Sequence, residues 1–116
     1  MVKPRFVPDR GDIIWVNFSS SVGREQRGQR PALVLSVKKY NERSGLAIIC
    51  PVTSKKKGYP LEIEFRAGDI HGVILVDHII SIDWRARRVK IAARASSSVI
   101  GEAQEKVALL ISGEYN

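Results

Sequence analysis

The sequence predicts a mainly β fold, a small and strongly bent antiparallel barrel with one C-terminal α-helix. Seven short apolar or alternating segments, bounded by Gly, Pro, Asn, Asp or Ser, are typical of strands. Only the last part of the chain has a helical repeat of apolar residues. The 116 residues suffice for one hydrophobic core but not for two, so residues 1–116 are expected to form a single domain.

The expected strands follow one another through most of the chain. Trp15 in the first strand is expected to be a core residue, and Pro31 opens the second strand, where proline is tolerated. Residues 38–45 indicate a turn of the hairpin type, and residues 66–72 a polar connection. The strands are expected at 12–18, 31–37, 46–52, 61–65, 73–76, 79–82 and 89–93.

The C-terminal helix is predicted from apolar residues that recur at steps of three and four. The serines at 96–98 offer an N-cap, and Gly113 offers a stop. The repeat indicates one amphipathic helix of about four turns that lies on the sheet. Its apolar face consists of Val99, Ile100, Ala103, Val107, Leu110 and Ile111.

The net charge of the chain indicates the class of its partner, and its apolar runs indicate its location. Nineteen basic and twelve acidic residues give a net charge of +7, which favours a polyanionic partner, first a nucleic acid and second an acidic protein. No apolar run approaches the roughly 18 residues that span a membrane, and no signal-like segment follows Met1, so a soluble cytoplasmic protein is expected. Cys50, the only cysteine, lies in an apolar run that indicates a buried thiol.

Two loops carry most of the candidate chemistry. Residues 23–31 join two apolar runs and combine two glycines, three arginines and one carboxylate, so they bring phosphate-binding donors and an acid together. Residues 53–60 combine hydroxyl groups with three consecutive lysines. A solvated basic turn is the alternative interpretation of each loop.

Two further segments have competing interpretations. The adjacent Asp77 and His78 suggest acid–base catalysis, but neighbouring residues in a strand point to opposite faces and need not share a site. Trp84 lies in a basic segment with Arg85 and Arg87. A hydrophobic anchor for the turn is favoured for Trp84 over stacking on a nucleic-acid base.

The chain resembles the MazF/PemK toxins, the endoribonucleases of bacterial toxin–antitoxin modules. The resemblance covers nearly the whole chain in order, and Leu75 stands where the Kid/PemK branch tends to have arginine, which favours the MazF-like branch. The motifs that carry it are Arg10-Gly11-Asp12-Ile13-Ile14-Trp15-Val16, Gly23-Arg24-Glu25-Gln26, Gly28-Gln29-Arg30-Pro31-Ala32-Leu33-Val34-Leu35, Pro51-Val52-Thr53-Ser54, Lys57-Gly58-Tyr59-Pro60, Gly72-Val73, Asp77 and Ser81-Ile82-Asp83-Trp84-Arg85-Ala86-Arg87.

This resemblance implies an SH3-like barrel of the CcdB/PemK type and a homodimer. It further implies an mRNA interferase that cuts single-stranded RNA at short sequences and thereby inhibits growth, with no metal and no cofactor. The implied partner, besides RNA, is a cognate MazE-like antitoxin whose acidic, flexible tail wraps the toxin.

The resemblance also implies roles for individual residues. In a metal-independent ribonuclease the substrate's 2′-hydroxyl is the nucleophile, and the products are a 2′,3′-cyclic phosphate and a 5′-hydroxyl. We expect Glu25 to be the general base, Arg30 to stabilise the phosphoryl charge and Thr53 to add a hydroxyl donor; the alternative gives both proton transfers to the arginine. The expected RNA-binding residues are Arg24, Arg27, Ser54, Lys56, Lys57, Asp77, His78, Arg85 and Arg87.

Three positions depart from the family pattern. Gln29 replaces a histidine of some relatives, so a histidine mechanism at this position is excluded because an amide cannot shuttle a proton. His78 and Ile80 stand where related sequences often have glutamine and lysine. These two sites are expected to touch bases or phosphate, so the ACA-type cleavage sequence of the family is not assigned to this protein. The alternatives are a gyrase-poisoning toxin of the same fold and an RNA-binding module without cleavage.

Overall fold

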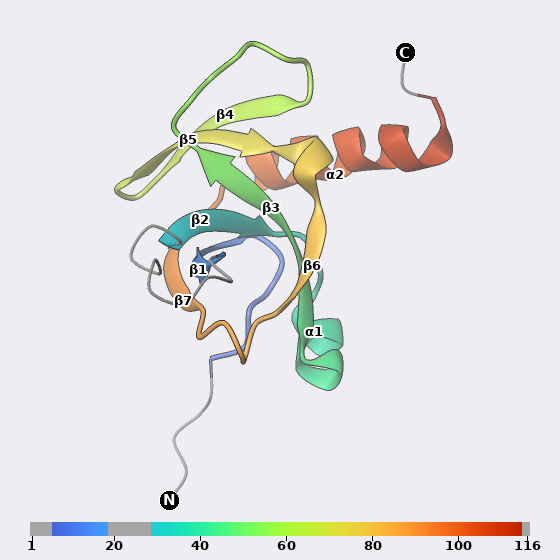
Figure 1. Cartoon of the computed structure of the whole chain (residues 1–116). Helices are drawn as coiled ribbons and strands as arrows, with labels where there is room; N and C mark the ends of the chain where they lie inside the picture. The colour runs from blue at the N-terminus through green and yellow to red at the C-terminus, as the bar shows by residue number, and fades with distance from the viewer. Residues whose placement is uncertain (1–5, 19–28, 115–116) are drawn as a thin grey trace, which may run out of the picture.

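The computed structural model of the chain describes residues 6–18 and 29–114. In these ranges seven strands form one curled antiparallel sheet with a C-terminal helix, which confirms the expected class of fold (Figure 1). The strands are β1 (Asp12–Asn17), β2 (Gln29–Val34), β3 (Leu46–Thr53), β4 (Glu62–Ala67), β5 (Ile70–Leu75), β6 (Ile80–Asp83) and β7 (Lys90–Arg94). The helical elements are α1 (Lys38–Ser44), the short 3-10 helix η2 (Val76–His78) and α2 (Ser97–Ser112).

Strand β3 is the centre of the sheet. The strand order is β4-β5-β3-β2-β1-β7, and β6 also pairs with β3. One edge of β3 pairs with β2, from Ile49↔Val34 to Pro51↔Ala32. The other edge pairs first with β6 and then, beyond it, with β5. Two strands therefore share one edge of β3, and the chain must pass from one to the other.

The passage from β5 to β6 contains more residues than the edge of β3 can pair. The chain takes six residue steps from Ile74 to Ile80, whereas β3 takes three steps from Val52 to Ile49. The extra residues leave the ladder, as in an enlarged bulge, and form η2. Asp77 and His78 lie in η2, so the strand geometry assumed for them from the sequence was wrong.

The apolar core lies on both faces of the curled sheet. Ile13 and Leu33 belong to a cluster on the face that α2 covers, whereas Ile14 and Val16 belong to a second cluster on the other face. Trp15 lies between Ile14 and Val16 and is 37% exposed, so the expectation of a core residue was wrong. Cys50 is fully buried, and this burial, with the charge of Asp77, raises the pKa of its thiol to about 12.

The C-terminal helix confirms the expected caps. The Ser96 side chain accepts a hydrogen bond from the Val99 N–H, and Gly113 ends the helix in the left-handed region with φ 83°. Ala103 is fully buried against the sheet, and Figure 1 shows α2 running along the side of the molecule that carries β4 and β5. Among the described helices, none is both long and apolar enough to cross a membrane.

Two connections differ from the expected ones. Residues 38–44 form α1 instead of a hairpin turn, since Lys, Glu and Arg favour helix and Gly45 supplies a left-handed C-cap with φ 76°. Residues 66–72 are mostly paired, because β4 and β5 continue to Ala67↔Ile70. Only Gly68 and Asp69 form the turn between them.

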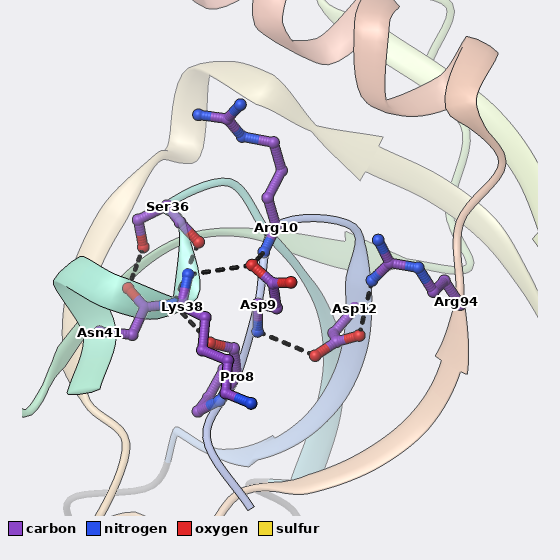
Figure 2. A network of polar contacts seen from close by, with 8 residues as sticks. All are labelled: Pro8, Asp9, Arg10, Asp12, Ser36, Lys38, Asn41 and Arg94. Atoms are coloured by element: carbon purple, nitrogen blue, oxygen red, sulfur yellow. Dashed lines mark hydrogen bonds and ion pairs between the residues drawn. The ribbon is translucent and has the colours of Figure 1, made fainter.

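Asn41 of α1 is a fully buried polar residue that joins several segments. Its Nδ2 donates to the carbonyl oxygens of Pro8 at 2.7 Å and Ser36 at 3.0 Å, and its Oδ1 accepts from the Ser36 hydroxyl (Figure 2). The Ser36 hydroxyl in turn accepts from the Ile48 N–H, and the Trp84 Nε1–H donates to the Asn41 carbonyl at 2.9 Å. Trp84 is 3% exposed, which confirms that it anchors its turn.

The Asn41 contacts predict a large effect on stability. Asn41→Ala removes the partners of two carbonyl groups and the Ser36 hydroxyl, so we expect a loss of about 3 kcal/mol in the free energy of unfolding. Urea unfolding at fixed protein concentration measures it. Lys39→Ala, on the exposed side of α1, is the control and should change stability by less than about 0.5 kcal/mol. An Asn41→Ala loss below about 1 kcal/mol would contradict a central role for this network.

Candidate functional site at the β5–β6 break

Two adjoining surface hollows meet at η2. They have Leu75, Asp77 and His78 in common, so they form one continuous depressed surface. The first hollow is also lined by Phe18, Arg30, Pro51, Ile79 and Ile80. The second is also lined by Thr53, Lys55, Lys57, Tyr59 and Glu62.

The register of β2 and β3 aligns Arg30 with Thr53. The last paired residues of these strands at this end are Ala32 and Pro51. Two residues further along each strand are Arg30 and Thr53, which therefore stand at the same level of the sheet and on the same face. Arg30 is exposed and lines the first hollow, whereas Thr53 is half-buried and lines the second.

Each of these two residues is held by a different neighbour. Arg30 is paired with Val16 of β1. Thr53 is paired with Val73 of β5, next to Gly72. A Cβ atom at Gly72 would lie 2.6 Å from the carbonyl oxygen of Thr53, so glycine is what allows β5 to approach Thr53 this closely.

The basic loop after Thr53 is ordered by a carboxylate of β4. The Glu62 side chain accepts backbone N–H groups of Lys57 at 3.1 Å and Gly58 at 2.8 Å. The Thr53 hydroxyl accepts the Lys55 N–H at 3.2 Å. Lys56 pairs with Glu64 at 3.0 Å, whereas Lys55 and Lys57 line the second hollow. Two of the three lysines therefore stand beside Thr53 in a fixed backbone.

Asp77 and His78 do share a site. Both line both hollows, and the Nε2 of His78 lies 4.0 Å from Oδ1 of Asp77. The argument that they need not share a site assumed a strand, whereas a helical turn can present adjacent side chains to one side. Their side chains are 60% and 49% exposed for His78 and Asp77, so this pair contributes little to stability and is free to meet a ligand.

The remaining predicted RNA-binding residues lie elsewhere or outside the described ranges. The Arg85 guanidinium lies 4.9 Å from the centre of the Trp84 ring and donates to the Glu42 carbonyl at 3.2 Å. Arg87 donates to the Asn17 carbonyl at 2.7 Å. These two arginines line hollows that do not include η2, while Ser54 is exposed next to Thr53. Arg24, Glu25 and Arg27 lie outside the described residues.

Sequence reasoning missed Tyr59, one of the apolar walls of the site. Tyr59 is 63% exposed and lines the second hollow, and the exposed Ile80 lines the first. An aromatic residue between Gly58 and Pro60 in a lysine-rich loop was the available signal for Tyr59. Ile80 was already singled out in the sequence as a departure from the family pattern.

The chemistry of this surface suits a phosphodiester. A guanidinium and two ammonium groups can neutralise phosphate oxygens, a hydroxyl can donate to them, and Tyr59 offers a ring face to a base. In the described parts of the chain, no three His, Cys, Asp or Glu side chains lie together in a way that could hold a metal ion.

Similar proteins share both the sequence and the fold. The endoribonuclease toxin MazF of Escherichia coli K12 is 48% identical over 83 residues, which cover 72% of this chain and 75% of that protein. A crystal structure of MazF from Deinococcus radiodurans superposes with a TM-score of 0.83 at 46% identity, covering 93% of this chain and 99% of that one. A MazE–MazF structure from the same organism gives 0.82 at 44% identity, with the same coverage.

The family model that matches is described as PemK-like, MazF-like toxin of type II toxin-antitoxin system, and it spans residues 9–111. This range includes every described element from β1 to α2 apart from the last residue of α2. The likeness thus extends over the sheet, the surface around η2 and the C-terminal helix together. The chain belongs to the PemK-like, MazF-like toxins of type II toxin–antitoxin systems.

Proposed function

We propose that this endoribonuclease toxin cleaves single-stranded RNA at short sequences without a metal ion, with the scissile phosphate between Arg30 and Thr53. The observation that supports the proposal most directly is the register of β2 and β3, which aligns these two residues, with Arg30 lining one hollow and Thr53 the adjoining one. Glu25 is proposed as the general base. The products are a 2′,3′-cyclic phosphate and a 5′-hydroxyl.

The proposed reaction needs three functions from the protein: a proton acceptor for the 2′-hydroxyl, donors that stabilise charge on the phosphoryl oxygens, and a proton for the departing 5′-oxygen. The 2′-hydroxyl of the nucleotide before the scissile phosphate attacks phosphorus, and the bond to the 5′-oxygen of the next nucleotide breaks. Arg30 offers its planar fork of N–H donors to the phosphoryl oxygens, where negative charge increases in the transition state. Thr53 offers a neutral hydroxyl donor from the facing strand. The 5′-oxygen leaves after it receives a proton.

Glu25 is favoured over Arg30 as the base for a chemical reason. A guanidinium keeps its proton at neutral pH, since arginine titrates above about 12, so it is a poor proton acceptor. A carboxylate accepts a proton readily and can return it to the leaving oxygen. Glu25 is the only carboxylate in residues 23–31, which place it close in sequence to Arg30.

The surface around η2 supports a path for single-stranded RNA on both sides of the scissile phosphate. Lys55 and Lys57 can neutralise neighbouring phosphates, and the exposed Tyr59 ring can stack on a base. Asp77 and His78 carry donors and acceptors that can meet base edges at the junction of the hollows. These contacts would provide sequence preference, while the phosphate contacts would provide most of the affinity.

A cognate antitoxin is the second proposed partner. The D. radiodurans relative is described in a MazE–MazF structure, and this chain carries a net charge of +7. An acidic segment that folds on binding would be attracted to the surface that holds RNA. We propose that it covers this surface on a homodimer of the toxin and so excludes RNA.

Replacing Arg30 tests the proposed reaction. Arg30→Ala should lower cleavage of a long single-stranded RNA in EDTA by at least about 100-fold, because one lost transition-state donor costs about 3 kcal/mol. Thermal unfolding should be nearly unchanged, since the side chain is exposed. Arg66→Ala removes another exposed cation, from β4 and outside both hollows, and is the matched control. Activity of Arg30→Ala within tenfold of wild type would sink the assignment.

Glu25→Gln tests the base. The amide keeps the size of the side chain but cannot accept the proton, so the acidic limb of the pH–rate profile should disappear and the maximal rate should fall. Single-turnover cleavage from pH 4.5 to 8 measures both. If the acidic limb persists with its midpoint unchanged, the base is another group, and Arg30 becomes the residue to consider.

Salt should separate RNA binding from antitoxin binding. Each phosphate that the protein neutralises on a single strand contributes a log–log slope of roughly 0.7, so RNA affinity should fall steeply with salt. An antitoxin peptide with apolar anchors should lose less affinity. A competition titration at two salt concentrations compares them. If saturating peptide leaves RNA affinity unchanged, the two ligands occupy separate surfaces.

A further inference from the structure

We infer that Arg87 is a positioning residue, which fixes the end of the β1–β2 hairpin and thereby sets where Arg30 stands. The inference rests on the proposed role of Arg30 in RNA cleavage. It assigns Arg87 a function within the protein instead of a direct contact with RNA.

The contact that carries the inference joins two distant parts of the chain. The Nη1 of Arg87 donates to the main-chain carbonyl of Asn17 at 2.7 Å, and Arg87 is only half-exposed. Asn17 is the last residue of β1 and pairs with Gln29, and the next pair is Val16↔Arg30. Arg87 therefore holds the ladder one residue pair away from Arg30.

The turn that carries Arg87 is held by several hydrogen bonds. The Ala86 N–H donates to the Asp83 carboxylate at 2.9 Å, and the Arg87 N–H donates to the Asp83 carbonyl at 3.1 Å. Trp84 at the start of the turn is buried and bonded to Asn41. A guanidinium presented from so fixed a backbone can define the position of the strand end that it binds.

The faces of β2 argue against a shared phosphate site. Arg87 and Gln29 line one hollow, whereas Arg30 lines another. Gln29 and Arg30 are neighbours in a strand, and neighbouring side chains point to opposite faces. Within one chain, Arg87 thus reaches Arg30 through the ladder, and loss of its contact should misplace the Arg30 guanidinium without removing a ligand of the substrate.

Steady-state kinetics of three variants test this inference. Arg87→Ala should lower kcat by about tenfold to 100-fold with KM within about twofold, because small misplacements of a catalytic group cost that much. Arg87→Lys keeps a donor of similar reach and should recover much of the loss. Arg88→Asn removes a charge from the same turn at a residue with φ 50°, which asparagine tolerates, and should leave kcat unchanged.

A double variant and the salt dependence of RNA binding distinguish a positioning residue from a phosphate ligand. In an Arg30→Lys background, Arg87→Ala should add little further loss, since it acts through the position of residue 30. The inference would be overturned if the activity losses of the two single variants multiplied in full, or if Arg87→Ala raised KM and made the salt slope smaller by roughly 0.7. Either result would identify Arg87 as a phosphate ligand. Fully active Arg30→Ala would instead refute the proposed function.

Hydrogen exchange completes the test. Amide protection should fall in β1 and β2 of Arg87→Ala and not in Arg88→Asn. Protection in Arg87→Ala equal to that of the wild type would overturn the inference.

Discussion

The shared edge of β3 is the constraint from which the site follows. Because β5 and β6 both pair with this edge, the chain between them must leave the ladder, and it leaves as η2. Val76 turns into the core, where its carbonyl accepts from the Cys50 thiol at 3.8 Å, while Asp77 and His78 turn outward. The two hollows meet at this point. The pairing of two strands with one edge of β3 thus places two polar side chains where the two hollows of the candidate RNA surface meet.

Asn41 holds together the end of the curled sheet that lies far from η2. A short helix such as α1 has little stability of its own, so it depends on tertiary contacts. The Asn41 contacts bind α1 to the N-terminal segment at Pro8, to β3 through Ser36, and to the β6–β7 turn through Trp84. The same contacts fix the turn from which Arg87 reaches β1. Closure of the fold and order at the end of the β1–β2 hairpin are therefore mechanically linked.

The sequence predicted what depends on local pattern. Alternation identified the segment that contains Ile63 and Phe65, and the apolar repeat with Ser96 and Gly113 identified α2 with its caps. It missed α1, because seven residues are too few for a helical period to be distinguished from a polar turn. It missed η2, because the surplus of residues is visible only once the register on β3 is known. The pairing of Arg30 with Thr53 as a site came from the family resemblance, since no local feature relates residues so far apart.

Arg30 and Thr53 stand just beyond the last paired residues of β2 and β3, so the ladder between these two strands does not hold them. Each depends on the strand at its other side, β1 for Arg30 and β5 for Thr53. The two supports are separate. The support of Arg30 includes the Arg87–Asn17 contact, and the support of Thr53 includes the close approach at Gly72. Arg30 lines the first hollow and Thr53 the second, so each support acts on one of the two adjoining hollows. The positions of Arg30 and Thr53 therefore depend on residues that do not line the two hollows.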